Sequence, residues 1–192
     1  MQRVLVFGDA HVPTRKKIIP QEFYQHIEET DYDLALITGD LIREADLLKI
    51  IPPLPRSFIV KGNMDYTFGY NFHEEIQLDD FKVLLLHGTQ LRPRGNIRQL
   101  HEILVNIDGD VAVHGHTHVA AIDQYKTKLF LNPGTITGAA SGSTGTQEAS
   151  FLELEVEGSH IHVVLHRKNS NLLTKTEVDY IKRNKQILRQ AD

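Results

Sequence analysis

Seven side chains of types that bind metal ions stand out because each lies just beyond a short apolar run. They are Asp9, His11, Asp40, Asn63, His87, His116 and His118. Glycines accompany them in the segments Gly8-Asp9-Ala10-His11, Gly39-Asp40, Gly62-Asn63-Met64-Asp65, His87-Gly88 and Gly115-His116-Thr117-His118. Imidazole, carboxylate and amide groups bind metals through nitrogen and oxygen, and the chain has no Cys to supply sulfur. This donor set favours Mn, Fe, Ni or Zn over Cu(I) or Ca.

The number of donors predicts two metal ions rather than one. Seven ligands are too many for one tetrahedral ion, but they suit two ions that share a bridging carboxylate. Two ions about 3.5–4 Å apart clamp the attacking and leaving oxygens of an in-line phosphoryl displacement. They also lower the pKa of bound water to about 7, which supplies hydroxide at neutral pH. The sequence therefore predicts metal-dependent hydrolysis of a phosphate ester.

The elements that would position these donors are short strands buried on both faces. Six continuous apolar runs are typical of such strands: residues 4–7, 34–37, 58–60, 83–86, 111–113 and 129–131. In an open α/β sheet, ligands bind beyond the carboxyl ends of the strands, so the donors that follow the first five runs should converge on one crevice. Adjacent glycines allow the backbone to turn sharply there.

Helical patterns lie between several of these runs, and together they predict an α/β fold with largely parallel central strands and flanking helices. The predicted helices span residues 22–29, 44–51 and 94–107. Alternating residues 151–156 and 160–166 around Glu157-Gly158 predict a C-terminal β-hairpin. The Gly-, Ser- and Thr-rich segment 135–148 is typical of a mobile surface loop. The basic segment 174–189 predicts a short helix or a frayed tail over residues 175–192.

Composition limits the class of protein. The 192 residues carry a formal net charge of −4 and no Cys, and they contain neither a linker nor a repeat, so residues 1–192 are expected to form one domain. Absence of Cys excludes a disulfide framework, a thiolate zinc site and a cysteine nucleophile. The charge balance offers no strong nucleic-acid footprint, and no apolar run approaches the length of a membrane span. The N-terminal run is strand-like rather than a secretory signal, so we expect a cytoplasmic protein.

The order of the five motifs resembles the calcineurin-like metallophosphoesterases. This resemblance implies an α/β sandwich with a dimetal site at its rim. It implies that one metal is held by Asp9, His11, Asp40 and His118, and the other by Asp40, Asn63, His87 and His116. Asp40 would bridge the two metals, and Asp40, Asn63 and His116 are the expected catalytic residues.

Two further segments are similar to the small single-domain branch of YfcE-type phosphodiesterases and Vps29. They are Gly8-Asp9-Ala10-His11-Val12-Pro13 and Asn132-Pro133-Gly134-Thr135-Ile136-Thr137-Gly138-Ala139. Asp40 is followed by Leu41-Ile42-Arg43-Glu44 instead of the Asp-Arg-Gly of protein phosphatases, which weakens a phosphoprotein interpretation. Many family members have His where this chain has Met64, and a thioether cannot transfer a proton to a leaving group. The departure suggests substrates with good leaving groups, or a proton supplied by water.

The leading hypothesis is a phosphodiesterase with two divalent metal ions, Mn²⁺ first and Ni²⁺, Fe or Zn²⁺ as alternatives, in which metal-bound hydroxide attacks a small phosphodiester. One alternative is a Vps29-like interaction scaffold with a vestigial or structural metal pocket, and another is a phosphomonoesterase. Neither the physiological substrate nor a homo-oligomeric state follows from the sequence.

The remaining ionisable groups are expected outside the metal centre. His114 is expected to pack behind the ligands, and Asp65 to have a structural role. Surface or half-buried positions are expected for His26, His73 and His101. His160, His162 and His166 occupy even positions of one strand and so share one face, where a second metal site is disfavoured. The basic residues near the C-terminus are expected to be solvated: Lys182, Arg183, Lys185 and Arg189.

Overall fold

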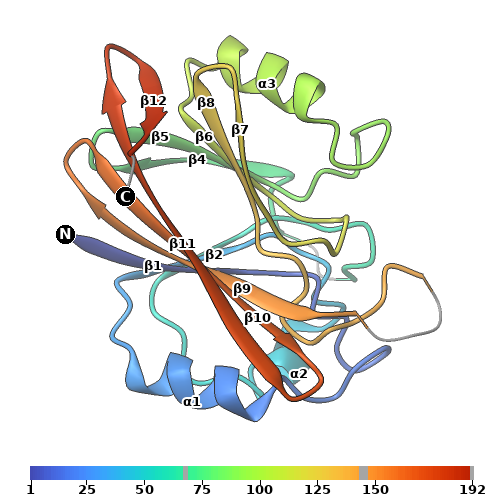
Figure 1. Cartoon of the computed structure of the whole chain (residues 1–192). Helices are drawn as coiled ribbons and strands as arrows, with labels where there is room; N and C mark the ends of the chain where they lie inside the picture. Colours follow the sequence, from blue (N-terminus) through green and yellow to red (C-terminus); the bar gives the residue numbers. More distant parts are fainter. Residues whose placement is uncertain (67–68, 143–146, 191–192) are drawn as a thin grey trace.

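The computed structural model describes residues 1–66, 69–142 and 147–190 as two packed β-sheets with helices on their outer sides (Figure 1). The larger sheet has the order β12 (Gln186–Arg189), β11 (Leu172–Arg183), β10 (His160–Asn169), β9 (Ala149–Glu157), β1 (Gln2–Phe7), β2 (Leu34–Ile37) and β3 (Ser57–Ile59). The smaller sheet has the order β4 (His73–Leu78), β5 (Phe81–Leu86), β6 (Val111–His114), β8 (Lys128–Asn132) and β7 (Ala121–Tyr125). The predicted α/β sandwich with largely parallel central strands and flanking helices is thus confirmed.

The six apolar runs are the parallel strands of these sheets. β1, β2 and β3 are parallel in the larger sheet, and β5, β6 and β8 are parallel in the smaller one. Val4 and Val83 lie in the core between the sheets, whereas the adjacent Leu5 and Leu84 belong to the outer clusters that the helices cover. Both faces of these strands are therefore buried, which explains why their sequences are continuously apolar.

Three helices complete the described elements. α1 (Gln21–Glu29) buries Phe23 and Ile27 against the outer face of the larger sheet, beside the short α2 (Glu44–Leu47). α3 (Ile97–Asn106) begins where the Asn96 side chain accepts hydrogen bonds from the backbone N–H groups of two residues in its first turn. It buries Leu100 and Leu104 against the outer face of the smaller sheet. None of the helices described is long and apolar enough to cross a membrane.

The C-terminal prediction of a helix or frayed tail is wrong, because residues 172–183 and 186–189 form β11 and β12. β11 pairs with β10 along ten residue pairs and extends the β9–β10 hairpin that the sequence did predict. The first six residues of β11 are all exposed, so they show no alternation between apolar and polar positions. Without that alternation, the usual sequence signal of a strand is missing.

The mobile-loop prediction for residues 135–148 is wrong for the first part of the segment. Thr135, Ile136, Thr137 and Ala139 are buried, and residues 143–146 lie outside the described residues. The Thr135 hydroxyl donates to the carbonyl of Asp9, and the Thr137 hydroxyl donates to the carbonyl of Ala10. The segment therefore supports the first metal-ligand motif from behind.

Candidate metal centre

The seven predicted ligands come together where the parallel strands of both sheets end. Asp9 and His11 follow β1, Asp40 follows β2, and Asn63 lies beyond β3. His87 follows β5, while His116 and His118 follow β6. The larger sheet thus supplies four donors and the smaller sheet three, so the centre lies between two sheets rather than at the edge of one.

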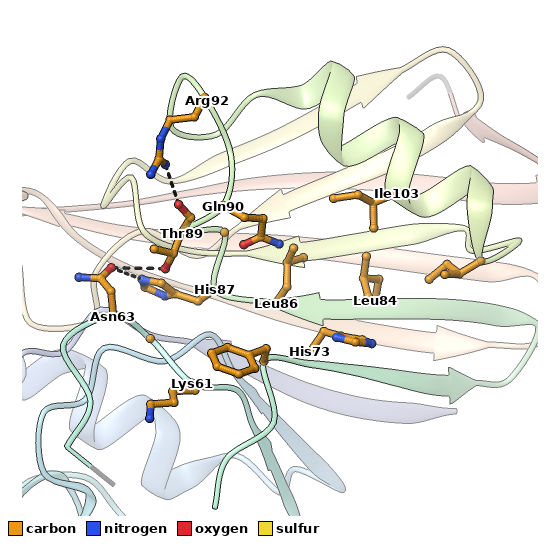
Figure 2. Close-up of a pocket in the computed structure, with 14 residues that line it drawn as sticks. Lys61, Asn63, His73, Leu84, Leu86, His87, Thr89, Gln90, Arg92 and Ile103 are labelled. Atoms are coloured by element: carbon orange, nitrogen blue, oxygen red, sulfur yellow. Dashed lines mark hydrogen bonds between the residues drawn. The ribbon is translucent and has the colours of Figure 1, made fainter. Parts of the chain in front are cut away.

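Asp40, His87 and His116 form one potential ligand group, with Asn63 beside it. His87 Nε2 lies 3.1 Å from His116 Nδ1 and 3.3 Å from Asn63 Oδ1. Figure 2 shows Asn63 and His87 directed toward one another. His87 Nδ1 lies 2.7 Å from the Thr38 carbonyl, a contact that requires a proton on Nδ1 and makes Nε2 the nitrogen that binds a metal once its own proton is displaced.

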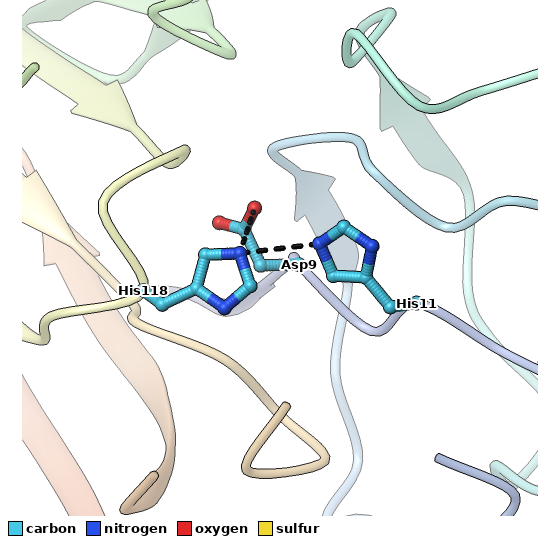
Figure 3. A group of neighbouring side chains, drawn as sticks. All are labelled: Asp9, His11 and His118. Carbon is cyan, nitrogen blue, oxygen red and sulfur yellow. Dashed lines mark hydrogen bonds and ion pairs between the residues drawn. The ribbon is translucent and has the colours of Figure 1, made fainter. Parts of the chain in front are cut away.

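Asp9, His11 and His118 form a second potential ligand group (Figure 3). His118 Nε2 lies 3.1 Å from His11 Nε2 and 3.4 Å from Asp9 Oδ1. His118 Nδ1 donates to the Ala139 carbonyl over 2.6 Å, which again leaves Nε2 available. The backbone N–H of His116 donates to Asp9 Oδ2 and so holds the carboxylate of one group against a residue of the other.

Asp40 lies between the two groups. Its Oδ2 is 3.5 Å from His11 Nε2 and 3.5 Å from His87 Nε2, and its Oδ1 accepts a hydrogen bond from the backbone N–H of Met64. One carboxylate oxygen therefore faces both ligand groups equally. This is the geometry expected of the bridging ligand.

The backbone at the centre is held in an unfavourable conformation. Asp9, His11, Asp40, His116 and His118 all have φ between 48° and 70°. The left-handed region costs a non-glycine residue roughly 1–2 kcal/mol. Such strain is concentrated at sites where the surrounding fold forces the conformation, and here it turns five donor side chains inward.

Glycines are required where the chain passes closest to the carboxylates. A Cβ atom added at Gly62 would lie 2.1 Å from Asp40 Oδ1 and 2.2 Å from the Asp40 backbone nitrogen. A Cβ atom at Gly115 would lie 2.7 Å from Asp9 Oδ2. Neither position can accept a side chain without moving a proposed ligand.

Asp65 positions Asp40 through the backbone. Its side chain accepts hydrogen bonds from the backbone N–H groups of Asp40 and Gly62 on Oδ2, at 2.9 and 2.8 Å, and of Ile42 on Oδ1, at 2.9 Å. Its side chain thus joins the loops that carry Asp40 and Asn63. This arrangement agrees with the structural role expected for Asp65.

Burial and mutual charge strongly perturb the titration of the cluster. Burial raises the pKa of Asp9 to about 6, and it lowers the pKa of His11 to about 3 and of His116 to about 4. Burial also works to lower the pKa of His87, but the Asp40 and Asp9 carboxylates outweigh it and raise that pKa to about 9. Neighbouring carboxylates and imidazoles of the cluster therefore have pKa values shifted in opposite directions.

The donor set fits a pair of divalent cations. Asp9 Oδ1 is buried and has no hydrogen-bond partner among the described residues, although it faces His118. Two pairs of imidazole nitrogens lie 3.1 Å apart, a close approach that a shared cation would satisfy. In His87 and His118, the ring nitrogen that faces away from the centre donates to a backbone carbonyl, as is usual for metal-bound imidazole.

Met64 leaves the outer side of the centre without a proton donor at that position. Its side chain is 38% exposed, and only its backbone N–H contacts Asp40. Asn63 beside it is also exposed. The edge of the centre at Asn63 and Met64 is therefore accessible to water.

The other histidines lie outside the centre. Buried His114 contacts the Asn132 amide 3.2 Å away, and burial lowers its pKa to about 4. His162 pairs with Asp179, whereas His166 pairs with Glu153, so the histidines of β10 do not converge. His26, Glu153 and His166 form a third group of potential ligands, but the two imidazoles and the Tyr32 hydroxyl already bond to the Glu153 carboxylate.

The remaining residues predicted at the surface lie at exposed or partly buried positions. His73 is exposed, and His26 and His101 are partly buried. Within the basic C-terminal segment, Lys182 pairs with Asp110 and Lys185 pairs with Asp108. These pairs attach the β11–β12 hairpin to the smaller sheet.

Two packed sheets with nitrogen and oxygen donors at the ends of their parallel strands define a metallophosphoesterase type of α/β protein. Residues 2–159 match the calcineurin-like phosphoesterase superfamily domain. A protein of Methanothermobacter thermautotrophicus described as a probable metallophosphoesterase is 33% identical over 134 residues, which are 69% of this chain and 76% of that protein. The chain therefore belongs to the calcineurin-like phosphoesterase superfamily.

Solved structures extend the similarity to nearly the whole chain. Vps29 of Entamoeba histolytica complexed with Zn²⁺ is 34% identical with a TM-score of 0.85, over 93% of this chain and 99% of that one. Vps29 of Cryptosporidium parvum is 27% identical with a TM-score of 0.84, over 94% of this chain and 98% of that one. A predicted phosphoesterase of Streptococcus pneumoniae, 22% identical with a TM-score of 0.64 over 92% of this chain and 97% of that one, shares the fold.

Proposed function

We propose that this protein is a phosphodiesterase that depends on two divalent metal ions. The observation that carries the proposal is the position of Asp40 Oδ2, 3.5 Å from an imidazole nitrogen of each ligand group. Asp9, His11, Asp40 and His118 would hold one ion, and Asp40, Asn63, His87 and His116 the other. Bound there, two such ions supply Lewis acidity and an activated water at neutral pH.

The groups around the centre would mainly position and orient the metal ligands. Thr38 and Ala139 fix two imidazoles through their carbonyls, and Asp65 fixes the backbone of Asp40. This rigidity limits the reorganisation needed when charge develops on the phosphoryl group. With Met64 at the exposed edge, no proton comes from that side chain, so diesters with good leaving groups are the expected substrates.

Hydrolysis of bis(p-nitrophenyl) phosphate with Mn²⁺ or Ni²⁺ tests this proposal. We expect the wild-type protein to be active and Asp40→Asn to lose at least about a hundredfold in kcat, because the variant loses the charge of the bridging group. Asp123→Asn, which removes an exposed carboxylate on β7, is the matched control and should retain full activity. Equal activity of wild type and Asp40→Asn would refute the mechanism. A phosphomonoester panel decides between diester and monoester specificity.

A Vps29-like interaction scaffold is the second candidate. Its support is the TM-score of 0.85 to Vps29 over 93% of this chain, together with the missing acid at Met64. Because Vps29 of Entamoeba histolytica is itself complexed with Zn²⁺, retention of metal does not separate the two candidates. A scaffold with a vestigial or structural pocket should hydrolyse neither diesters nor monoesters after Mn²⁺ loading, whereas the enzyme should. The complete donor set favours the enzyme, and Mn²⁺ is the first choice of metal.

The same proposal covers the domain range and the cellular compartment of the protein. β9 to β12 extend the sheet that contains β1, which supports one metallophosphoesterase domain over residues 1–192. A chain without Cys that uses only nitrogen and oxygen ligands is compatible with the cytoplasm, where we place it.

A further inference from the structure

A cavity of about 850 Å³ opens directly beside the metal centre. Asn63 and His87 line one end of it, and Leu84, Leu86 and Ile103 line the other (Figure 2). Cavities of roughly 300–1,000 Å³ are typical of sites for small organic ligands. The cavity is therefore both large enough for a ring-sized group and continuous with the proposed ligands.

Leu84, Leu86 and Ile103 form an apolar wall of the cavity, which results from the way α3 covers the smaller sheet. Leu100 and Leu104 of α3 are completely buried against the sheet, but Ile103, one position from Leu104, is only partly buried and faces the cavity. Leu84 and Leu86 point outward from β5 into the same space. Ile103 is thus the partly exposed part of this wall, and Leu84 and Leu86, at 2% and 1% exposed, form its buried base beside the strongly polar centre.

Phe72 adds an aromatic ring to this lining. The residue lies immediately before β4 and its side chain is 76% exposed, which is unusual for a large apolar side chain. An exposed aromatic ring in a cavity lining offers a face for stacking with a planar group.

The polar end carries positive charge. Arg92 lines the cavity, and its guanidinium donates to the carbonyls of Thr89 and Leu91 at 2.6 and 2.9 Å. The Thr89 side chain in turn approaches Asn63. A ligand with an anionic group at one end and an apolar group at the other matches this distribution.

We propose that the cavity receives one ester group of the substrate and selects phosphodiesters in which that group is a planar apolar or aromatic ring. The inference rests on the proposed function, because the anionic phosphate is placed at the metal centre. The ring lies between Phe72 and the α3 wall, while the phosphate remains within reach of Asn63 and His87. Small alkyl diesters leave this surface uncovered and bind more weakly.

Binding of two unreactive probes tests the inference. Calorimetry with Mn²⁺-loaded protein compares diphenyl phosphate with dimethyl phosphate, and the first should bind at least about tenfold more tightly, since even small apolar differences in a pocket change recognition by 10–200-fold. Ile103→Asn should remove most of this preference. Val105→Asn is the matched control, because Val105 lies on the same helix with its side chain 51% exposed and outside the cavity lining.

A second variant protects the test against misfolding of the first. Phe72→Ser changes a side chain that is already exposed, so the fold should survive while the preference for diphenyl phosphate falls. Equal binding of both probes to wild type, or a preference that survives both variants, would overturn the inference. If equal binding accompanies hydrolysis of bis(p-nitrophenyl) phosphate, the proposed function stands without the ring pocket. If the preference depends on Ile103 and Phe72 but no diester is hydrolysed, the pocket stands and the proposed function fails.

Discussion

Replacement of Asp65 by Asn should weaken both the fold and the metal centre. The carboxylate accepts three backbone N–H groups, from Asp40, Ile42 and Gly62, with its side chain buried among them. Asn offers one acceptor oxygen, so at least one N–H would face an amide NH₂ group. Hydrogen bonds to a charged group contribute about 1.5–3 kcal/mol each, and an unpaired buried donor adds about 1–3 kcal/mol of cost.

We therefore expect Asp65→Asn to lower the free energy of unfolding of the metal-free protein by about 3 kcal/mol, which in a domain of this size lowers Tm by about 6–12 °C. Because the lost contacts hold the backbone of Asp40, Mn²⁺ affinity should also fall by about 10–100-fold, as for other groups that orient ligands. Urea unfolding measures the first effect and calorimetric titration the second. Asp123→Asn should change neither. An Asp65→Asn protein with unchanged unfolding free energy and unchanged Mn²⁺ affinity would refute the reasoning.

Three further predictions concern different parts of the molecule. Gly62→Ala should abolish tight Mn²⁺ binding, because its Cβ would overlap Asp40 Oδ1, whereas Gly142→Ala should not, since its Cβ would meet no atom of the described residues within 4 Å. Calorimetric titration measures both effects. Met64→His should raise kcat for diesters with poor alkoxide leaving groups and leave kcat for p-nitrophenyl diesters nearly unchanged, as steady-state kinetics would measure. An equal change in kcat for both classes of diester would argue against a missing proton donor. Glu153→Gln should destabilise the fold by about 2 kcal/mol near neutral pH, as measured by urea unfolding, because a partly buried carboxylate, 12% exposed, loses charge-assisted bonds to His166, His26 and Tyr32.

The effect of Glu153→Gln should depend on pH. Burial favours the protonated acid, but hydrogen bonds from His166, His26 and Tyr32 outweigh burial and hold the pKa of Glu153 far below its usual range. A lowered pKa in the folded state stabilises the fold above the unfolded pKa of about 4.3, and this contribution declines as the pH falls below that value. The difference in unfolding free energy between wild type and Glu153→Gln should therefore shrink in acid. A difference that grows in acid would contradict the assignment.

The parallel strands were predictable because burial on both faces leaves a continuous apolar run. The strands without such runs were missed, and their environment explains why. β4 and β7 lie at the edges of the smaller sheet and present polar side chains such as Glu75 and Asp123 to solvent, while β11 begins with exposed residues. Because these strands were missed, the division into two sheets was expected only from the family resemblance and not from the apolar pattern.

The sequence also predicted which donors would meet, but not what holds them. Residue types and order brought Asp9 and His118 into one hypothesis because each follows a parallel strand. Their support comes from backbone groups, such as the Ala139 carbonyl that fixes His118, and backbone groups leave no trace in residue type. The hydroxyls of Thr135 and Thr137 likewise hold the backbone of Asp9 and Ala10, although the composition of their segment suggested a surface loop.

Anomalous diffraction from Mn²⁺-soaked crystals tests the central claim most directly. The account predicts two peaks per chain, one among Asp9, His11 and His118 and one among Asp40, His87 and His116, with Asp40 contacting both. No peak at these side chains, or a single peak that does not contact Asp40, would contradict it.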